Sequence, residues 1–305
     1  MLAIVGPTGI GKSEIAIVLS RQIPIEIVVV DSMQVYRGMD LGTGKPEPSV
    51  RQYIPHHGLD LVDPEEEFNA VRYAQVVRPA LPMIQARGKM PVLVGGSGLY
   101  LRALLDGLCP APGKDPAVRE QLTAEAMELG AKALHARLEK VDLPVATKVH
   151  PNDLRRIVRA LEVFVVTGRP LSQWQKGAAG ELGTGFPVRL IGLTCDRDSL
   201  YRRIERRMDG WIQAGWLEEA RGLYSRRLSQ TAGEALGYRE LFAFLGGRAD
   251  WKTTEQLIKR NTCRYAKRQL TWFKADSRIE WIETDGKTPE LVADEIMTRW
   301  NGRCS

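Results

Sequence analysis

The fold is decided by a stretch near the N-terminus that reads Gly6-Pro7-Thr8-Gly9-Ile10-Gly11-Lys12-Ser13. This stretch matches the phosphate-binding motif G-x-x-x-x-G-K-[ST] at every fixed position. The glycines let backbone N–H groups curl around phosphate oxygens, Lys12 adds a point charge, and Ser13 can ligate Mg²⁺. We therefore expect all eight residues to hold a phosphoanhydride, although the motif alone does not identify that group as ATP.

The segments around this loop indicate an α/β fold. Apolar runs typical of buried strands occupy residues 2–5, 25–30, 91–94 and 189–194. Helical patterns follow the loop to about residue 20 and recur at residues 70–85 and 99–105. Pro79 and Pro82 must kink or interrupt the helix expected at residues 70–85. Short apolar strands that alternate with helices predict a P-loop NTPase-like parallel sheet with helices on both faces.

A helical segment without obvious strands lies between two stretches rich in glycine and proline. These stretches are residues 107–116 and 177–187. We interpret residues 117–176 as a small helical insertion domain on two flexible connectors, and residues 1–116 with 177–305 as the catalytic core. The alternative is that these helices only add further cover to the main sheet.

Composition and charge restrict the class of protein. Lys and Arg exceed Asp and Glu by 43 − 37 = 6. This excess suits a polyanionic partner, but a solvated basic surface would give the same balance. No apolar run is long enough to span a bilayer, and the motif at Gly6 leaves no room for a signal peptide, so we expect a cytoplasmic protein. The four cysteines lie far apart and share no ligand spacing with the four histidines, which predicts reduced thiols and no structural zinc.

A carboxylate follows the second expected strand. The apolar run at residues 25–30 ends in Asp31, as does the strand that carries the Mg²⁺-binding aspartate of many P-loop enzymes. Open α/β sheets also bind their ligands at the carboxyl ends of strands. We therefore place Asp31 in the same site as the phosphate loop, whereas its position alone does not say whether it binds metal or accepts a proton.

The residues after this strand resemble a known family. They read Asp31-Ser32-Met33-Gln34-Val35-Tyr36-Arg37-Gly38-Met39-Asp40-Leu41-Gly42-Thr43-Gly44-Lys45-Pro46. The tRNA dimethylallyltransferase family commonly shows D-S-x-x-x-Y-x-G-x-x-I-G-T-A-K-P, so Leu41 and Gly44 depart from its pattern. Further blocks follow in the family's order at residues 94–100, 150–153, 159–163, 237–239 and 265–272. The zinc-finger extension of eukaryotic relatives has no counterpart, so the chain resembles the bacterial type.

The resemblance implies a prenyl transfer to RNA. Members of the family move a dimethylallyl group from dimethylallyl diphosphate to N6 of the adenosine immediately 3′ of the tRNA anticodon, and diphosphate leaves. The phosphate loop would then hold the prenyl donor with Mg²⁺, without ATP hydrolysis. Asp31 is implied as the general base. Arg207, with Lys12 and Ser13, is implied to stabilise the leaving diphosphate. The implied partners are dimethylallyl diphosphate and the tRNA anticodon stem-loop, and we expect a monomer without an obligate protein partner.

Several of the implied residues also have simpler interpretations. Arg207 lies in a basic stretch that Asp198 is expected to cap, and Glu205 could serve as its local partner on a solvated face. Ser97 is implied as an RNA contact but can also cap the following helix, and Arg119 can be an ordinary exposed arginine.

Basic residues at helical spacing support an RNA-binding surface. Arg155 and Arg159 share one face of an expected helix, and Arg260 and Arg264 form a stripe near the C-terminus. Gln34 can read the edge of an adenine that has left the base stack. The full set of expected RNA-binding residues is Asp31, Ser32, Met33, Gln34, Ser97, Arg119, Arg155, Arg156, Arg159, Gly237, Tyr238, Arg239, Arg260 and Arg264.

Three other functions share parts of this pattern. A small-molecule or nucleotide kinase would use the same loop and the same aspartate, but would consume ATP and need no RNA. An adenylate isopentenyltransferase would accept free AMP, which needs neither basic helices nor an insertion domain. A non-enzymatic RNA-binding protein would have no use for the combination of Lys12, Ser13 and Asp31.

Overall fold

The computed structural model describes residues 1–109, 111–177 and 187–302. The chain divides into two compact units, one formed by Met1–Leu104 with Thr184–Ser305 and the other by Leu105–Gly183. The smaller unit thus begins earlier than residue 117, the predicted start of the insertion. The connector predicted at residues 177–187 lies almost entirely outside the described residues.

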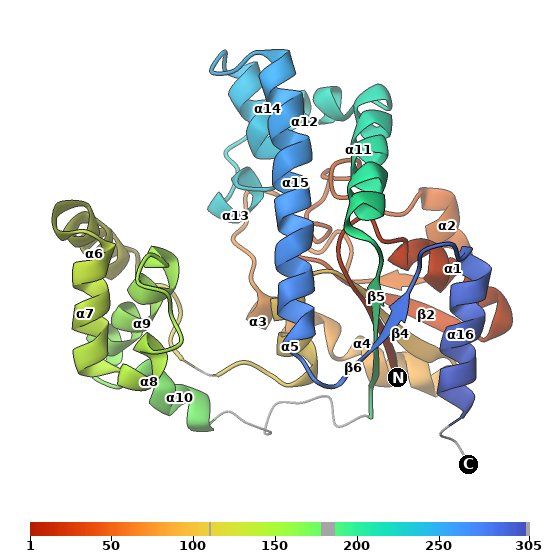
Figure 1. Ribbon diagram of the computed structural model, residues 1–305, viewed down its shortest axis with the longest axis horizontal. Helices are drawn as coiled ribbons and strands as arrows, with labels where there is room; N and C mark the ends of the chain where they lie inside the picture. Colours follow the sequence, from red (N-terminus) through yellow and green to blue (C-terminus); the bar gives the residue numbers. More distant parts are fainter. Residues whose placement is uncertain (110, 178–186, 303–305) are drawn as a thin grey trace. The chain divides into compact units, whose positions relative to one another are not determined.

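The larger unit is built on one parallel sheet. Its six strands follow the order β3-β2-β4-β1-β5-β6, and every strand pair is parallel. Figure 1 shows α1 and α16 on one side of the strands and α15 on the other. The strands are β1 (Leu2–Val5), β2 (Ile25–Val30), β3 (His56–His57), β4 (Met90–Gly95), β5 (Arg189–Thr194) and β6 (Ile279–Glu283). The predicted α/β class with a parallel sheet is confirmed.

The sequence pattern missed β3 and β6. β3 has only two residues, too few to show a pattern, and a buried carboxylate of β2 fixes it in place. Glu26 is 2% exposed and lies 2.7 Å from His57 Nε2 and 2.6 Å from an Arg87 nitrogen. Burial alone would raise the pKa of Glu26, but hydrogen bonds from Arg87, His57 and Lys89 lower it to about 2. Glu26 therefore stays ionised and ties the edge strand to its neighbour.

The helix expected at residues 70–85 is divided at a proline. α3 ends at Val77, and α4 begins at Ala80 with Pro79 as its N-cap. Pro82 lies in the first turn of α4, where backbone N–H groups have no partner within the helix, so its missing N–H costs little.

The helix that carries Arg207 is α11 (Arg197–Gln213), and its cap differs from the prediction. Asp196, not Asp198, accepts from the N–H groups of Asp198 and Ser199, at 2.9 and 3.0 Å.

No helix in the described parts of the chain is long and apolar enough to cross a membrane. The other helices of the larger unit are α1 (Lys12–Gln22), α2 (Pro48–Tyr53), α3 (Ala70–Val77), α4 (Ala80–Ala86), α5 (Gly98–Leu105), α12 (Trp216–Tyr224), α13 (Gln230–Gly233), α14 (Tyr238–Leu245), α15 (Trp251–Lys274) and α16 (Pro289–Asn301).

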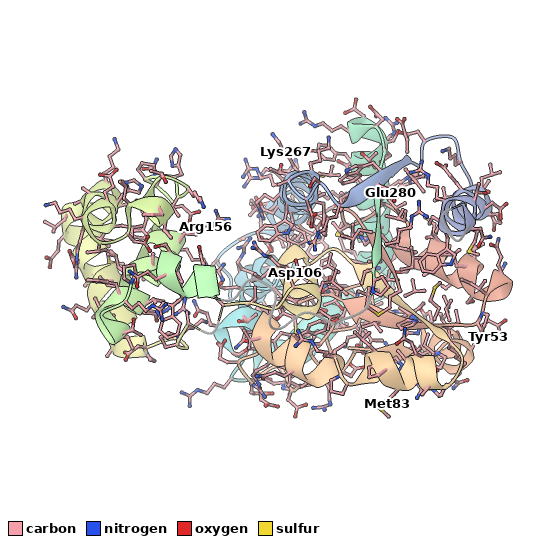
Figure 2. All side chains as sticks on the ribbon, turned by 90° about the horizontal axis from the view of Figure 1, so that it is seen from below. Tyr53, Met83, Asp106, Arg156, Lys267 and Glu280 are labelled. Carbon is pink, nitrogen blue, oxygen red and sulfur yellow. The ribbon has the colours of Figure 1, made fainter. Side chains whose placement is uncertain are left out.

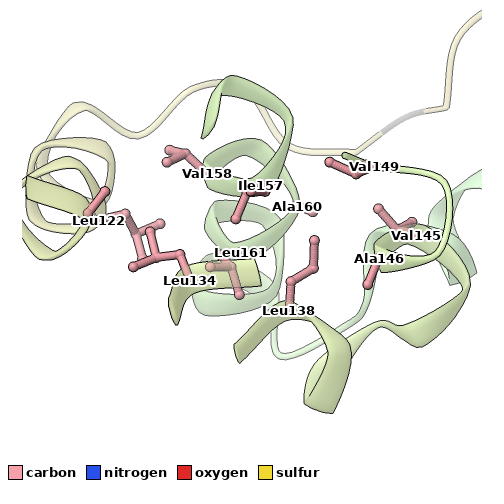
Figure 3. Close-up of a cluster of buried hydrophobic side chains, with 11 residues drawn as sticks. Leu122, Leu134, Leu138, Val145, Ala146, Val149, Ile157, Val158, Ala160 and Leu161 are labelled. Atoms are coloured by element: carbon pink, nitrogen blue, oxygen red, sulfur yellow. The ribbon is translucent and has the colours of Figure 1, made fainter. Parts of the chain in front are cut away.

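The smaller unit is helical throughout its described elements and has its own core. Leu134 and Leu138 of one helix pack with Ile157 and Leu161 of another, and all four side chains are fully buried (Figure 3). A separate core of this kind is what allows a segment to be a compact unit. Its helices are α6 (Pro116–Leu129), α7 (Ala131–Val141), α8 (Leu143–Ala146), α9 (Leu154–Thr167) and α10 (Leu171–Gly177).

Candidate active site

The phosphate-binding motif forms the turn between β1 and α1. Gly9 and Gly11 have φ angles of 85° and 97°, in the left-handed region that glycine reaches without strain. A Cβ on Gly9 would also lie 2.8 Å from a side-chain carbon of Ile204 in α11. The first N–H groups of α1 open onto this turn, and the helix N-terminus favours an anion there.

Lys12 is the first residue of α1, and its side chain turns back into the loop. Its Nζ donates to the carbonyl oxygens of Gly6 and Pro7, at 3.0 and 2.7 Å. Burial and the positive charge of Arg207 lower the pKa of Lys12 to about 7, and the negative charge of Asp31 offsets only part of this effect. The ammonium group therefore lies where a further negative charge would stabilise it.

Arg207 of α11 reaches the same loop. One terminal nitrogen donates to Thr8 Oγ1 at 2.5 Å, and the guanidinium carbon lies 4.6 Å from the centre of the Trp211 ring. Its Nε is buried and makes no hydrogen bond within the described residues. Burial lowers the pKa of Arg207 to about 10, so the group remains cationic at neutral pH. A buried cation with an unpaired N–H donor is suited to binding an anionic oxygen.

Asp31 follows β2 directly and faces these cations. Its Oδ1 accepts from the N–H groups of Met33 at 2.8 Å and Gln34 at 3.3 Å, which orients the carboxylate. Burial raises the pKa of Asp31 above its ordinary value, although these bonds and the charges of Lys12 and Arg207 oppose the shift. A carboxylate with a raised pKa is a better proton acceptor than an exposed aspartate.

Ser97 joins the end of β4 to the end of β2, as expected for neighbouring parallel strands. Its Oγ accepts from the Ser32 N–H at 3.0 Å, and its carbonyl oxygen accepts from the Leu101 N–H at 3.0 Å. The side chain is 8% exposed. The hydroxyl therefore braces the residue next to Asp31, which the sequence pattern did not predict.

The amide of Gln34 has a fixed orientation. Its Nε2 donates to the carbonyl oxygens of Thr43 at 2.9 Å and Gly44 at 3.4 Å. Only the NH₂ end of an amide can face two carbonyls, so Oε1 must point the other way. Gln34 thus offers its amide oxygen as an acceptor to the edge of a base, because its NH₂ group is engaged by the two carbonyls.

A carboxylate of α12 holds the loop that bears these carbonyls. Glu219 accepts from the N–H groups of Asp40 and Leu41, at 3.0 and 2.9 Å, and from the hydroxyl of Tyr238. Tyr238 is fully buried, which argues against the predicted RNA contact by its side chain. Gly237 is also structural, because a Cβ there would lie 2.2 Å from the Trp216 ring. Glu219 had no signal in the sequence, since a carboxylate that binds a distant backbone leaves no local pattern.

Two of the expected RNA-binding arginines in the smaller unit are engaged by a buried carboxylate. Glu162 is fully buried and accepts from Arg119 at 2.7 Å and Arg159 at 2.8 Å. Arg159 also donates to the carbonyl oxygens of Pro112 and Gly113, at 2.6 and 3.2 Å. These bonds tie the segment before α6 to α9, which explains why the unit begins before residue 117. Arg119 and Arg159 therefore have a structural role that the sequence did not predict.

The remaining expected arginines lie at the surface. Arg155, Arg260 and Arg264 are exposed. Arg156, labelled in Figure 2, is exposed and forms a local ion pair with Asp153 at 3.4 Å. The guanidinium of Arg239, which is exposed, donates to the neighbouring Glu240. RNA contacts at these exposed positions stay a prediction.

Two curated relatives illustrate the likeness of the whole chain to known proteins. A tRNA dimethylallyltransferase from Geobacter sulfurreducens is 45% identical over 287 residues, which cover 93% of this chain and 91% of the relative. A tRNA dimethylallyltransferase from Symbiobacterium thermophilum is 44% identical over 301 residues, covering 98% and 94% of the two chains. Both are named for the activity that the sequence motifs implied, rather than for a kinase or an AMP-specific enzyme.

Solved structures and family models agree with these relatives. The tRNA isopentenylpyrophosphate transferase of Bacillus halodurans has a TM-score of 0.73 and 36% identity, covering 99% of this chain and 95% of that one. A eukaryotic dimethylallyltransferase acting on tRNA has a TM-score of 0.77 and 26% identity, covering 98% and 79% of the two chains. The family models described as IPP transferase and isopentenyl transferase match residues 34–276 and 1–60. The chain therefore belongs to the IPP transferase family of tRNA dimethylallyltransferases.

Proposed function

We propose that this protein transfers the dimethylallyl group of dimethylallyl diphosphate to N6 of the adenosine immediately 3′ of the tRNA anticodon, with release of diphosphate. The observation that carries the proposal is the combination of a cationic phosphate loop with the partly buried carboxylate of Asp31. Lys12 and Arg207 converge on the loop, and each of them interacts electrostatically with Asp31. A prenyl transfer needs charge of opposite sign at its two ends, and this site supplies both.

The reaction divides between the two ends of the site. The C1–O bond of the donor breaks, its electron pair leaves on the diphosphate, and C1 forms a bond with N6. Lys12 and Arg207 stabilise the negative charge that develops on the leaving oxygen. N6 loses a proton as it is alkylated, and Asp31 accepts this proton. Because Oδ1 of Asp31 already accepts two backbone bonds, we assign proton acceptance to Oδ2.

The amide of Gln34 would complete the acceptor side. Its Oε1 can accept a hydrogen bond from one N6–H of adenine while Asp31 accepts from the other. Both hydrogens of the amino group would then orient the nitrogen in the site. A 6-oxo purine has no such donor, which would leave the amide oxygen unpaired. The site would therefore favour adenine over guanine or hypoxanthine through a single acceptor, Gln34 Oε1. The carbonyls of Thr43 and Gly44 set the direction of this acceptor.

We also propose Mg²⁺ as the cofactor, bound through Ser13. Ser13 lies in the first turn of α1 with an exposed side chain, so its hydroxyl can reach an ion above the loop. Mg²⁺ usually takes only one or two protein ligands beside phosphate and water oxygens. A single hydroxyl ligand is consistent with this coordination. The ion would add positive charge at the diphosphate. We further propose that the protein acts as a monomer in the cytoplasm, where tRNA is its substrate.

One assay tests the reaction. The wild-type protein is mixed with radiolabelled dimethylallyl diphosphate and Mg²⁺, without ATP, and with either tRNA or AMP as acceptor. We expect label in the tRNA and none in AMP. Labelled AMP with unlabelled tRNA would identify an adenylate isopentenyltransferase, and a strict need for ATP would restore the kinase interpretation.

The exposed arginines of α9 provide a test of RNA binding. The variant Arg155→Ala/Arg156→Ala should weaken tRNA binding and lower the slope of log affinity against log salt by about one unit per lost phosphate contact. Filter binding at several salt concentrations measures this slope. Preference among tRNAs should not change, because phosphates carry no base identity.

Arg159→Ala is the comparison, because it also removes a partner of buried Glu162. We expect it to lower the free energy of unfolding by roughly 1–3 kcal/mol, because charged hydrogen bonds are lost while Arg119 still pairs with Glu162. Urea denaturation separates this structural loss from a loss of RNA contacts. An unchanged salt slope for Arg155→Ala/Arg156→Ala would return both side chains to ordinary surface charges.

A further inference from the structure

One buried amide of α15 connects two loops of the candidate active site. Gln269 is 5% exposed. Its Oε1 accepts from the Thr8 N–H at 2.8 Å, and its Nε2 donates to the Gly96 carbonyl oxygen at 2.9 Å. A Cβ on Gly96 would lie 2.3 Å from the same Nε2, so glycine at this position makes room for the amide.

The two loops belong to opposite ends of the reaction. Thr8 lies in the phosphate loop, where its hydroxyl accepts from Arg207. Gly96 precedes Ser97, whose hydroxyl accepts from the Ser32 N–H beside Asp31. Thr8 therefore belongs to the loop that would bind the leaving diphosphate. Gly96 belongs to the loop that braces the segment carrying the general base. Gln269 is hydrogen-bonded to both loops through a single rigid amide plane.

At neutral pH the chemistry of the two contacts favours an amide. Thr8 presents a donor and Gly96 presents an acceptor, and only a group with both functions on one carbon can satisfy them together. An ionised carboxylate would accept from Thr8 but would face the Gly96 oxygen without a proton. An apolar side chain would leave both buried backbone groups without a hydrogen-bond partner, which destabilises the folded state.

We propose that Gln269 is a positioning residue that sets the spacing between the diphosphate-binding loop and the loop that braces the general base, and this proposal rests on the proposed prenyl transfer. Transfer of the dimethylallyl group requires the attacking nitrogen, C1 and the leaving oxygen to lie in line. An error of about 1 Å in such an alignment can cost about 10² in rate. Gln269 controls this alignment without touching either substrate.

The decisive variant is Gln269→Glu, because its defect depends on pH. A protonated glutamic acid carries one O–H donor and one carbonyl acceptor, as the amide does. Burial can raise a glutamate pKa to about 8–9, and the facing Gly96 carbonyl acts in the same direction, whereas the Thr8 N–H and the charge of Arg207 beside Thr8 oppose part of the shift. We expect kcat of the variant, divided by that of the wild type at the same pH, to fall about 10-fold or more near pH 8.5. The ratio should recover as the pH falls toward about 6.

Two further variants control this measurement. Thr262→Val removes another buried hydrogen bond of α15, from Thr262 Oγ1 to the Ile258 carbonyl at 2.8 Å, so its kcat ratio should be near one and independent of pH. Gly96→Ala displaces the amide from the other end by its Cβ. Because the displaced atom is the tip of a flexible side chain, we expect Gly96→Ala to fold, to lose kcat and to show no recovery in acid.

The outcomes separate the two hypotheses. A wild type that makes no prenylated tRNA would overturn the proposed function itself. Suppose instead that the wild type is active. The positioning role would then be overturned if the kcat of Gln269→Glu, divided by that of the wild type, stays within twofold of one. It would also be overturned if this kcat ratio is lowered equally at all pH values. Should Gln269→Glu fail to fold by circular dichroism, a normal kcat for Gly96→Ala would overturn the role instead.

Discussion

Replacing Asp31 with asparagine is expected to lower kcat by about 10²–10⁴, the usual cost of losing a general base. Asparagine keeps an oxygen that can accept from the Met33 and Gln34 N–H groups, so the turn after β2 should survive. The amide cannot take a proton from N6. Single-turnover rates with saturating tRNA and prenyl donor measure this loss, while tRNA affinity should stay close to that of the wild type.

The pH profile provides a second measure of the same role. Burial raises the pKa of Asp31, so the wild-type rate should fall on acidification at a higher pH than an exposed aspartate would give. The Asp31→Asn profile should lack this acid limb. Asp63→Asn is a matched control, because Asp63 is half exposed and its side chain forms a surface ion pair with Arg37. Turnover of Asp31→Asn within a few-fold of the control would remove Asp31 from the mechanism.

Loss of the Arg207 guanidinium should reduce kcat by about 10²–10³, comparable with the removal of one oxyanion donor elsewhere. Among the described residues its Nε has no hydrogen-bond partner, and its terminal nitrogen orients Thr8, so both the cation and its direction would be lost in Arg207→Ala. Arg206→Ala serves as the control, since Arg206 is the exposed neighbour on the same helix. Added ATP should stimulate neither protein. Equal rates for the two variants would exclude Arg207 from charge stabilisation.

Lys12 adds a pH dependence to donor binding at the same end of the site. Because burial and Arg207 lower its pKa to about 7, the free protein loses this charge as the pH rises above that value. A bound diphosphate would favour the charged form, so binding at about pH 8 should take up a proton. Calorimetry in buffers of different ionisation enthalpy measures the uptake, and Lys12→Met should abolish it.

The sequence by itself determined the features that depend on neighbouring residues. Residues 6–13 identified the phosphate loop because its parts need fixed spacing. The tight turn requires glycines, and Lys12 must follow them at the start of the helix to place its charge. Three strands, β1, β2 and β5, have the bounds predicted from their apolar runs, since burial on both faces of a parallel sheet leaves a continuous pattern. Asp31 followed from its place after β2. Arg207 was implied only by resemblance to the family.

The tertiary structure alone decided the contacts between distant segments. Gln269 meets Thr8 across 261 positions of sequence, and Glu219 meets Leu41 across 178, and neither contact has a periodicity or a motif. Arg159, which was expected at the RNA-binding surface, instead forms an ion pair with the buried Glu162. Each of these side chains satisfies buried backbone groups or a buried charge, and folding brings those groups together only when the chain closes on itself. Local sequence patterns record which faces are buried, whereas the choice of polar partners depends on the completed packing.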